Sequence, residues 1–195
     1  MKKIVKILEL YRKESFLDDD GKTLSLKFRE QSTLEAITKY EIDNRIEIPI
    51  ELKKLLLFSN GLDLFGVHIY SLEEMEYFPS SKILTFHNWG NGDFDCISVG
   101  GDYPKGTIVF MAHSEDNLIF ISDNLTDWII GVIAEIKSKG TLLHPFDYSK
   151  EDSKHDVEGI YKNISYQINK ISSCQINKNN SCQINKNMFN VKDLE

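Results

Sequence analysis

Apolar residues recur along the first 140 positions with two different periods, and these periods divide the chain into expected helices and strands. Apolar positions three or four residues apart share one face of a helix, whereas alternating positions share one face of a strand. The first spacing predicts helices over residues 2–14, 33–44, 49–58 and 125–139. Alternating or continuous apolar positions between turn residues predict strands over residues 24–28, 67–70, 82–87, 94–99, 107–112 and 117–122.

Two capping-box spacings mark expected helix starts. Ser32 can accept a hydrogen bond from the first helical turn while Glu35, three residues later, reaches back to the backbone of the cap. Ser71 and Glu74 have the same spacing, so a further short helix is expected over residues 72–77.

The stretch from residue 46 to residue 70 is the expected centre of the fold. Pro49 suits the first turn of a short helix, whose apolar face then carries three leucines. Asn60-Gly61 supplies a residue able to take positive φ, with which helices commonly end. A helix this short is marginal alone, so packing must hold it against the apolar strand that follows.

The order of the elements indicates the fold class. The later strands are separated by short turns rich in Gly and Asp, which join antiparallel neighbours, whereas parallel strands need a long crossover. The sequence therefore predicts an α+β fold. In it, a twisted antiparallel meander of about five to six strands is covered by helices from both ends of the chain.

The last quarter of the chain has a different character. Gln-Ile-Asn-Lys repeats at positions 167, 175 and 183, a period of eight that makes no straight helical stripe. Abundant Asn, Ser and Lys together with low hydrophobicity favour a flexible segment over a packed one. We therefore expect one domain over residues 1–150 and a low-complexity, eight-residue-repeat tail over residues 151–195.

Composition narrows the classes of partner. The formal net charge is −7, which disfavours binding to nucleic acid and would suit a basic protein partner. No apolar run approaches the length of a membrane span, and the N-terminal stretch is interrupted by charges where a secretory signal would be continuous. Three cysteines without a CxxC pair favour neither a disulfide framework nor a zinc site. Cytoplasmic residence and no membrane contact are the expectations.

Several polar residues near the meander turns are candidates for chemistry. A metal site would draw on His87, Asp93, Asp95, His113 and Asp116, and a small metal-dependent hydrolase would use the first four of these. Their spacing matches no ligand pattern, and turn formation and solvation explain them more simply. Cys96, with two histidines as potential bases, could serve as a nucleophile, but a small core residue in a strand is the simpler interpretation. No cofactor is expected.

The chain resembles a known family in several short motifs that occur in the same order. The motif residues are Glu41, Ile48-Pro49, Leu52, Leu55, Leu56 and Asn60-Gly61, then residues 88–95, then Leu125, Trp128, Ile129 and Val132. Over roughly residues 30–140 this pattern resembles the SUKH superfamily, which includes yeast cell-wall glucan-synthesis regulators and many bacterial immunity proteins.

The resemblance implies a non-enzymatic binding protein. The first hypothesis is a bacterial immunity protein that neutralises a toxin by direct binding, and a regulatory scaffold of the yeast type is the alternative within the binding class. The small metal-dependent hydrolase is the competing class. For the first hypothesis, the expected partner-binding residues are Asp63, Glu73, Glu74, Glu76, Trp89, Asp93 and Asp95.

Overall fold

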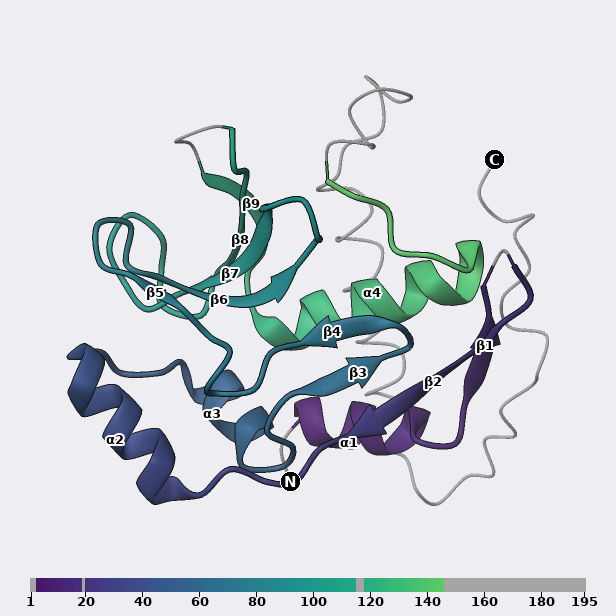
Figure 1. The fold of residues 1–195 in the computed structure, drawn as a ribbon, viewed down its shortest axis with the longest axis horizontal. Helices are drawn as coiled ribbons and strands as arrows, with labels where there is room; N and C mark the ends of the chain where they lie inside the picture. The colour runs from purple at the N-terminus through teal and green to yellow at the C-terminus, as the bar shows by residue number, and fades with distance from the viewer. Residues whose placement is uncertain (1–2, 19, 115–117, 146–195) are drawn as a thin grey trace, which may run out of the picture.

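Helices lie against a single antiparallel sheet in the computed structural model, which describes residues 3–18, 20–114 and 118–145 (Figure 1). The helices of these described residues are α1 (Lys3–Tyr11), α2 (Leu34–Asn44), α3 (Ile50–Leu56) and α4 (Leu125–Lys139). The strands are β1 (Ser15–Leu17), β2 (Thr23–Phe28), β3 (Leu62–Leu64), β4 (Val67–Ile69), β5 (Tyr77–Phe78), β6 (Ile83–Asn88), β7 (Phe94–Ser98), β8 (Ile108–Met111) and β9 (Leu118–Ser122). The predicted α+β class is confirmed. The repeats of residues 151–195 lie outside the described part, so the domain boundary stays a prediction.

The sheet follows the order of the chain. Its strands lie in the order β1-β2-β3-β4-β6-β7-β8-β9, with β5 paired beside β6, and every pairing is antiparallel. This is the predicted meander. The described residues hold nine strands where about five to six were expected, because the three strands that were not predicted, β1, β3 and β5, are only two or three residues long and leave little periodic signal.

The sequence predicts a single strand over residues 67–70, and the structure instead shows a hairpin of β3 and β4. Leu64 pairs with Val67, so the turn consists of Phe65 and Gly66 alone. Both turn residues have positive φ, 55° and 94°, as two-residue hairpin turns of this hand require. Phe is rarely found there, but its ring is buried at 1% exposure, 4.5 Å from the ring of Phe16. Packing thus holds a backbone conformation that the residue type disfavours.

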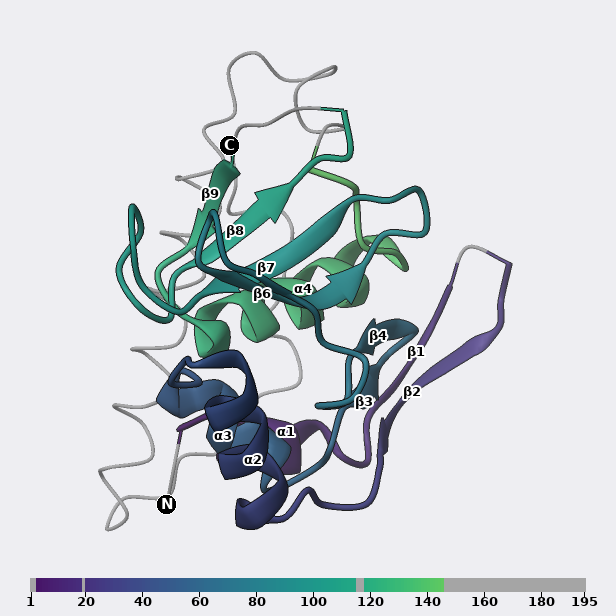
Figure 2. The same cartoon turned by 60° about the vertical axis from the view of Figure 1, so that its left-hand side comes forward.

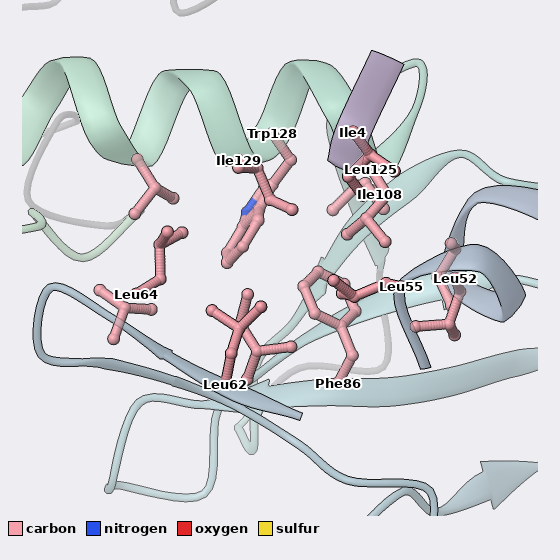
Figure 3. Close-up of a cluster of buried hydrophobic side chains, with 14 of the residues drawn as sticks. Ile4, Leu52, Leu55, Leu62, Leu64, Phe86, Ile108, Leu125, Trp128 and Ile129 are labelled. Carbon is pink, nitrogen blue, oxygen red and sulfur yellow. The ribbon is translucent and has the colours of Figure 1, made fainter. Parts of the chain in front are cut away.

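The main core lies between the sheet and the helices that cover it (Figure 3). Trp128 of α4 meets Phe86 of β6 edge to face, with ring centroids 4.9 Å apart and planes at 86°. α1, α3 and α4 contact one another, and Ile4 and Leu8 place the buried face of α1 in this core. Figure 2 shows α4 lying along β6 and β7 while α2 stands at the end of the molecule near α3.

The helix starts differ in detail from the capping-box predictions. Thr33, not Ser32, caps α2, and its hydroxyl accepts from the backbone N–H of Ala36 at 3.1 Å. Ser71 and Glu74 do form the predicted bond, at 2.7 Å from the Ser71 N–H to the carboxylate. The residues after Ser71 make a turn instead of a helix, because Tyr77 already pairs in the sheet as part of β5.

The Asn60-Gly61 stop is also displaced. α3 ends at Leu56, and Leu57 closes it with an ordinary right-handed conformation. Gly61 does take positive φ, at 78°, but it stands where the chain enters β3. A Cβ at this position would lie 2.7 Å from the backbone nitrogen of Ser71, so the glycine is required by a close approach of two backbone segments.

Candidate functional site

The expected partner-binding residues fall on opposite faces of the sheet. Asp63 pairs across from His68, whereas the next residue of β4, Ile69, pairs across from His87. Because side chains alternate between faces along a strand, His68 and His87 point to opposite sides. Asp95 pairs across from His87 and therefore shares the face covered by α4. The structure does not bring the whole set together.

Three of these residues gather in the turn of residues 71–76, which we call the acidic turn. Glu73, Glu74 and Glu76 are exposed there, while Leu72 and Met75 anchor the turn with exposures of 3% and 6%. Leu72 and Met75 are the two apolar residues of this otherwise polar segment. The carboxylates are thus presented from a backbone that is fixed by burial.

Hydrogen bonds from two other elements fix the acidic turn further. The side chain of Asn60 donates to Glu73 at 2.9 Å and accepts from the N–H of Leu72 at 2.8 Å. The hydroxyl of Tyr40, on α2, donates to the carbonyl of Met75 at 3.1 Å. The Asn60 bond is the main reason that the pKa of the Glu73 carboxyl lies below its ordinary value.

Glu74 connects the acidic turn to the outer face of the sheet. Its carboxylate accepts from Arg29 at 2.8 Å and lies 3.2 Å from the ring nitrogen Nε2 of His68. Burial acts to raise the pKa of Glu74, but the bonds from Ser71, His68 and Arg29 outweigh it and lower the pKa to about 2. Glu74 is therefore ionised and tied to the fold by these contacts, whereas Glu73 and Glu76 make no ion pair with a basic side chain among the described residues.

Asp93 is an interior hub near the start of β7 and not a surface charge. It is 1% exposed, and its carboxylate accepts from the backbone N–H of His113 at 2.7 Å and from the Asn91 side chain at 2.8 Å. The rings of His113 and His144 approach it to 2.6 and 2.9 Å. Burial acts to raise the pKa of Asp93, but the bonds from His113 and Asn91 outweigh it and lower the pKa. An ionised carboxylate only accepts, so both ring nitrogens donate.

His144 was not identified from the sequence as a candidate site residue. It follows α4 without any motif of its own, yet its ring lies 4.9 Å from that of Trp89 and 5.2 Å from that of Phe110. Through Asp93 it ties the segment after α4 back to the sheet. No local signal in the sequence marks this role, because the partners are far away along the chain.

Asp95 is buried without a hydrogen-bond partner among the residues that the structure describes. Both carboxylate oxygens are enclosed, and so is the unpartnered indole Nε1 of Trp89. Burial raises the pKa of Asp95 to about 7, and the nearby indoles of Trp89 and Trp128 offset only part of this shift. An ordinary strand aspartate would face solvent, and the sequence held no sign that this one turns inward.

His87 lies beside Asp95 and forms part of a cleft. The carbonyl of His68 accepts from Nδ1 of His87 at 2.9 Å, which leaves Nε2 as the unprotonated nitrogen of the neutral ring. Burial lowers the pKa of His87 to about 4. The cleft, which we call the Trp89 cleft, lies between the β3–β4 turn, the end of β6 and the end of α4, and is lined by Gly66, His87, Trp89, Ile136 and Leu142 among others.

The sequence-derived candidates for other chemistry are arranged differently. Asp116 lies outside the described part of the chain, and within that part no three His, Cys, Asp or Glu side chains are placed to hold a metal ion. Cys96 is fully buried on the other face of β7, packed with Ile83 and Val109, and burial raises the pKa of its thiol well above the ordinary value. A thiol in this environment is a core side chain.

Comparison with known proteins assigns the chain to a family. Across residues 3–18, 20–114 and 118–145, no helix is both long and apolar enough to cross a membrane. A comparison with curated proteins finds no match. The model of the SMI1 / KNR4 family (SUKH-1) matches residues 31–131, from α2 into α4. At the family level this supports an immunity or regulatory binding protein that acts through protein–protein interaction, and the family is generally non-enzymatic. Since the match covers more than half of the chain, the chain belongs to the SMI1 / KNR4 family (SUKH-1).

Proposed function

We propose that this chain is an immunity protein that neutralises a bacterial toxin by binding it directly. Membership of the SMI1 / KNR4 family supports a binding role, and the acidic turn is the structural observation that carries the proposal toward a basic partner. The whole chain has a net charge of −7, which favours encounter with a positively charged protein.

The acidic turn suits a docking role because it is rigid before binding. Its backbone is held by Asn60, by Tyr40 and by two buried apolar side chains. Ordering a loop on binding costs free energy, so a loop that is already ordered binds at lower cost. Glu73 and Glu76 form no ion pair with a basic side chain in the described part, which leaves their charges available to a partner.

The remaining expected residues take different parts in the proposal. Asp63 pairs across the sheet with His68, and the ring of His68 contacts Glu74 of the acidic turn. The carboxylate of Asp63, however, lies 3.6 Å from Lys27 and accepts a hydrogen bond from the N–H of Gly66. We therefore assign it a minor role at the rim. Asp93 and Asp95 are enclosed in this conformation and would act on a partner only through their neighbours.

Co-expression tests the proposal. The chain should restore growth to cells that produce a cognate basic toxin, sought first in the adjacent genes, and the two proteins should co-purify as a stoichiometric complex. Growth inhibition that persists although both proteins are present and folded would reject neutralisation by direct binding.

Charge reversal then tests the acidic turn. The double variant Glu73→Lys/Glu76→Lys should associate with the purified toxin roughly 2- to 10-fold more slowly at low salt, since rim charges act mainly on the association rate. The difference should shrink as salt is added. The matched control is Glu14→Lys/Asp20→Lys, which makes the same change of net charge on exposed residues beside the edge strand β1. Equal slowing by the two variants would mean that only net charge matters.

A further inference from the structure

We propose that the Trp89 cleft receives one arginine side chain of the protein partner. The inference rests on the proposed function and names a second contact, on the α4 side of the sheet, away from the acidic turn. The cleft is formed where three elements meet: the β3–β4 turn, the end of β6 and the end of α4. It is a place for a single side chain, not a docking surface.

The walls of the cleft suit a flat, cationic group. Trp89 is half-buried, and edge-on contacts with His87 at 5.1 Å and His144 at 4.9 Å hold its ring in place. A guanidinium stacks well on an indole, and the indole is the best of the aromatic rings for binding cations. Apolar side chains from α4 and the segment after it complete the walls and accommodate the aliphatic stem of arginine.

The charges around the cleft favour a positively charged ligand over a negatively charged one. Among the residues that the structure describes, no charged side chain lines it, and the side chain of His87 is neutral. Behind Trp89 and His87 lies the carboxylate of Asp95, fully enclosed and without a hydrogen-bond partner in the described chain. A buried, unpaired carboxylate is costly, and a cation nearby would stabilise its ionised form. An anion in the same place would be repelled once Asp95 is ionised.

Two further groups favour a donor-rich cation. Nε2 of His87 carries a lone pair, because Nδ1 donates to the carbonyl of His68. α4 ends at Lys139 beside the cleft, and the C-terminal end of a helix is its negative pole. The last turn of α4 also carries two basic side chains, Lys137 and Lys139. The ammonium group of Lys139 lies 3.2 Å from the carboxylate of Glu135, which offsets its positive charge. Arginine fits better than lysine, because it is less strongly hydrated and presents five donors in a plane.

The test uses the full chain, labelled with ¹⁵N, and two pentapeptides, Gly-Gly-Arg-Gly-Gly and the same peptide with citrulline. Citrulline has almost the shape of arginine but no charge. The arginine peptide should shift the indole signal of Trp89 and the amide signals of Gly66 and Leu142 in a saturable way, with an affinity about tenfold above that of the citrulline peptide. Equal affinities would overturn the inference, and so would shifts confined to other parts of the protein.

Two variants make the assignment specific. Asp95→Asn should reduce the affinity for the arginine peptide to that for the citrulline peptide, while Asp102→Asn removes an exposed charge at the other end of β7 and should change nothing. Trp89→Leu should abolish binding in a protein whose other amide signals are unchanged. Undiminished binding by Asp95→Asn would reject the inference. A toxin complex that forms normally while the arginine peptide fails to bind would reject it too and leave the proposed function standing.

Discussion

Burial acts on Asp95 and His87 in opposite ways, although they are direct neighbours on β7 and β6. It raises the pKa of the carboxyl to about 7 and lowers that of the imidazole to about 4. Both shifts have one cause, since a charged group loses its hydration in the interior. Both residues are therefore neutral in the folded protein over much of the acidic range. Between about pH 4 and pH 7 the fold holds both residues uncharged at its centre, and above that range Asp95 ionises.

The first prediction concerns Asp95→Asn. An unfolded aspartate ionises near its ordinary pKa of 3.8, whereas the folded one holds its proton to about pH 7. Between these values the folded state binds the extra proton, so the stability that Asp95 contributes at low pH is lost as pH rises toward 7. Asn carries no such cost. The variant should be more stable than the parent at pH 8 by about 1–3 kcal/mol and nearly equal to it at pH 4.

Urea unfolding at pH 4 and pH 8 measures this difference. Asp102→Asn is the control, because it removes an exposed carboxylate of the same kind and should show no such change with pH. A variant at Asp95 that is less stable than the parent at pH 8 would mean that the carboxylate finds a partner in solution.

At the scale of elements, the connection from α3 to β3 illustrates how two backbone segments share one space. Gly61 lies against the chain just after β4, with no room for a Cβ beside Ser71. Gly21, in the turn between β1 and β2, has nearly the same positive φ, 77° against 78°, but no atom of the described residues lies within 4 Å of its Cβ position. Comparing the two glycines therefore separates the free-energy cost of a positive φ in a residue with a Cβ from the cost of a steric clash between that Cβ and the neighbouring backbone.

The second prediction compares Gly61→Ala with Gly21→Ala. Both force alanine into the left-handed region, which costs roughly 1–2 kcal/mol. Gly61→Ala must also push apart two packed backbone segments, so we expect it to cost about 3 kcal/mol or more in total. Thermal or urea unfolding of both proteins gives the comparison. Equal destabilisation would show that the backbone near Ser71 moves aside at little cost.

At the scale of the whole molecule, the expected boundary near residue 150 yields the third prediction. The tail is less hydrophobic than the rest of the chain and rich in Asn, Ser and Lys, so its removal should expose little buried surface. A chain that ends at residue 154 should melt within about 2 °C of the full chain, since a loss of 1 kcal/mol would lower Tm by about 2–8 °C in domains of up to 250 residues. A drop of several degrees, or loss of solubility, would place the repeats in the core.

The sequence predicted the parts of the fold that repeat a pattern and missed those that depend on one distant contact. The later strands and α4 carry strong periodicity, and Asn124 and Gly140 cap α4 as their residue types suggest. The β3–β4 turn was missed because Phe65 is an improbable residue at positive φ, and only its packing against Phe16 explains it. Packing of this kind leaves no local trace.

The candidate site shows the same limit. The exposed carboxylates of the acidic turn could be found from their local spacing, as the bond between Ser71 and Glu74 shows. The inward direction of Asp95 could not, because a polar residue in a strand ordinarily marks the solvent face. His144 reaches Asp93 from 51 positions away, and no pattern links two such residues in a single sequence.

The packing of α1 against α4 has a consequence for the order of folding. The two helices lie at opposite ends of the described chain, yet the buried face of α1 is covered only when α3 and α4 are in place. At a synthesis rate of about 5–20 residues per second, α1 waits on the order of ten seconds for α4 to be made. The meander can pair strand by strand during that time, because nearly all its neighbours are close in sequence. The long-range contact between the first and last helices would then close the domain last, with Ile4 and Leu8 exposed until it does.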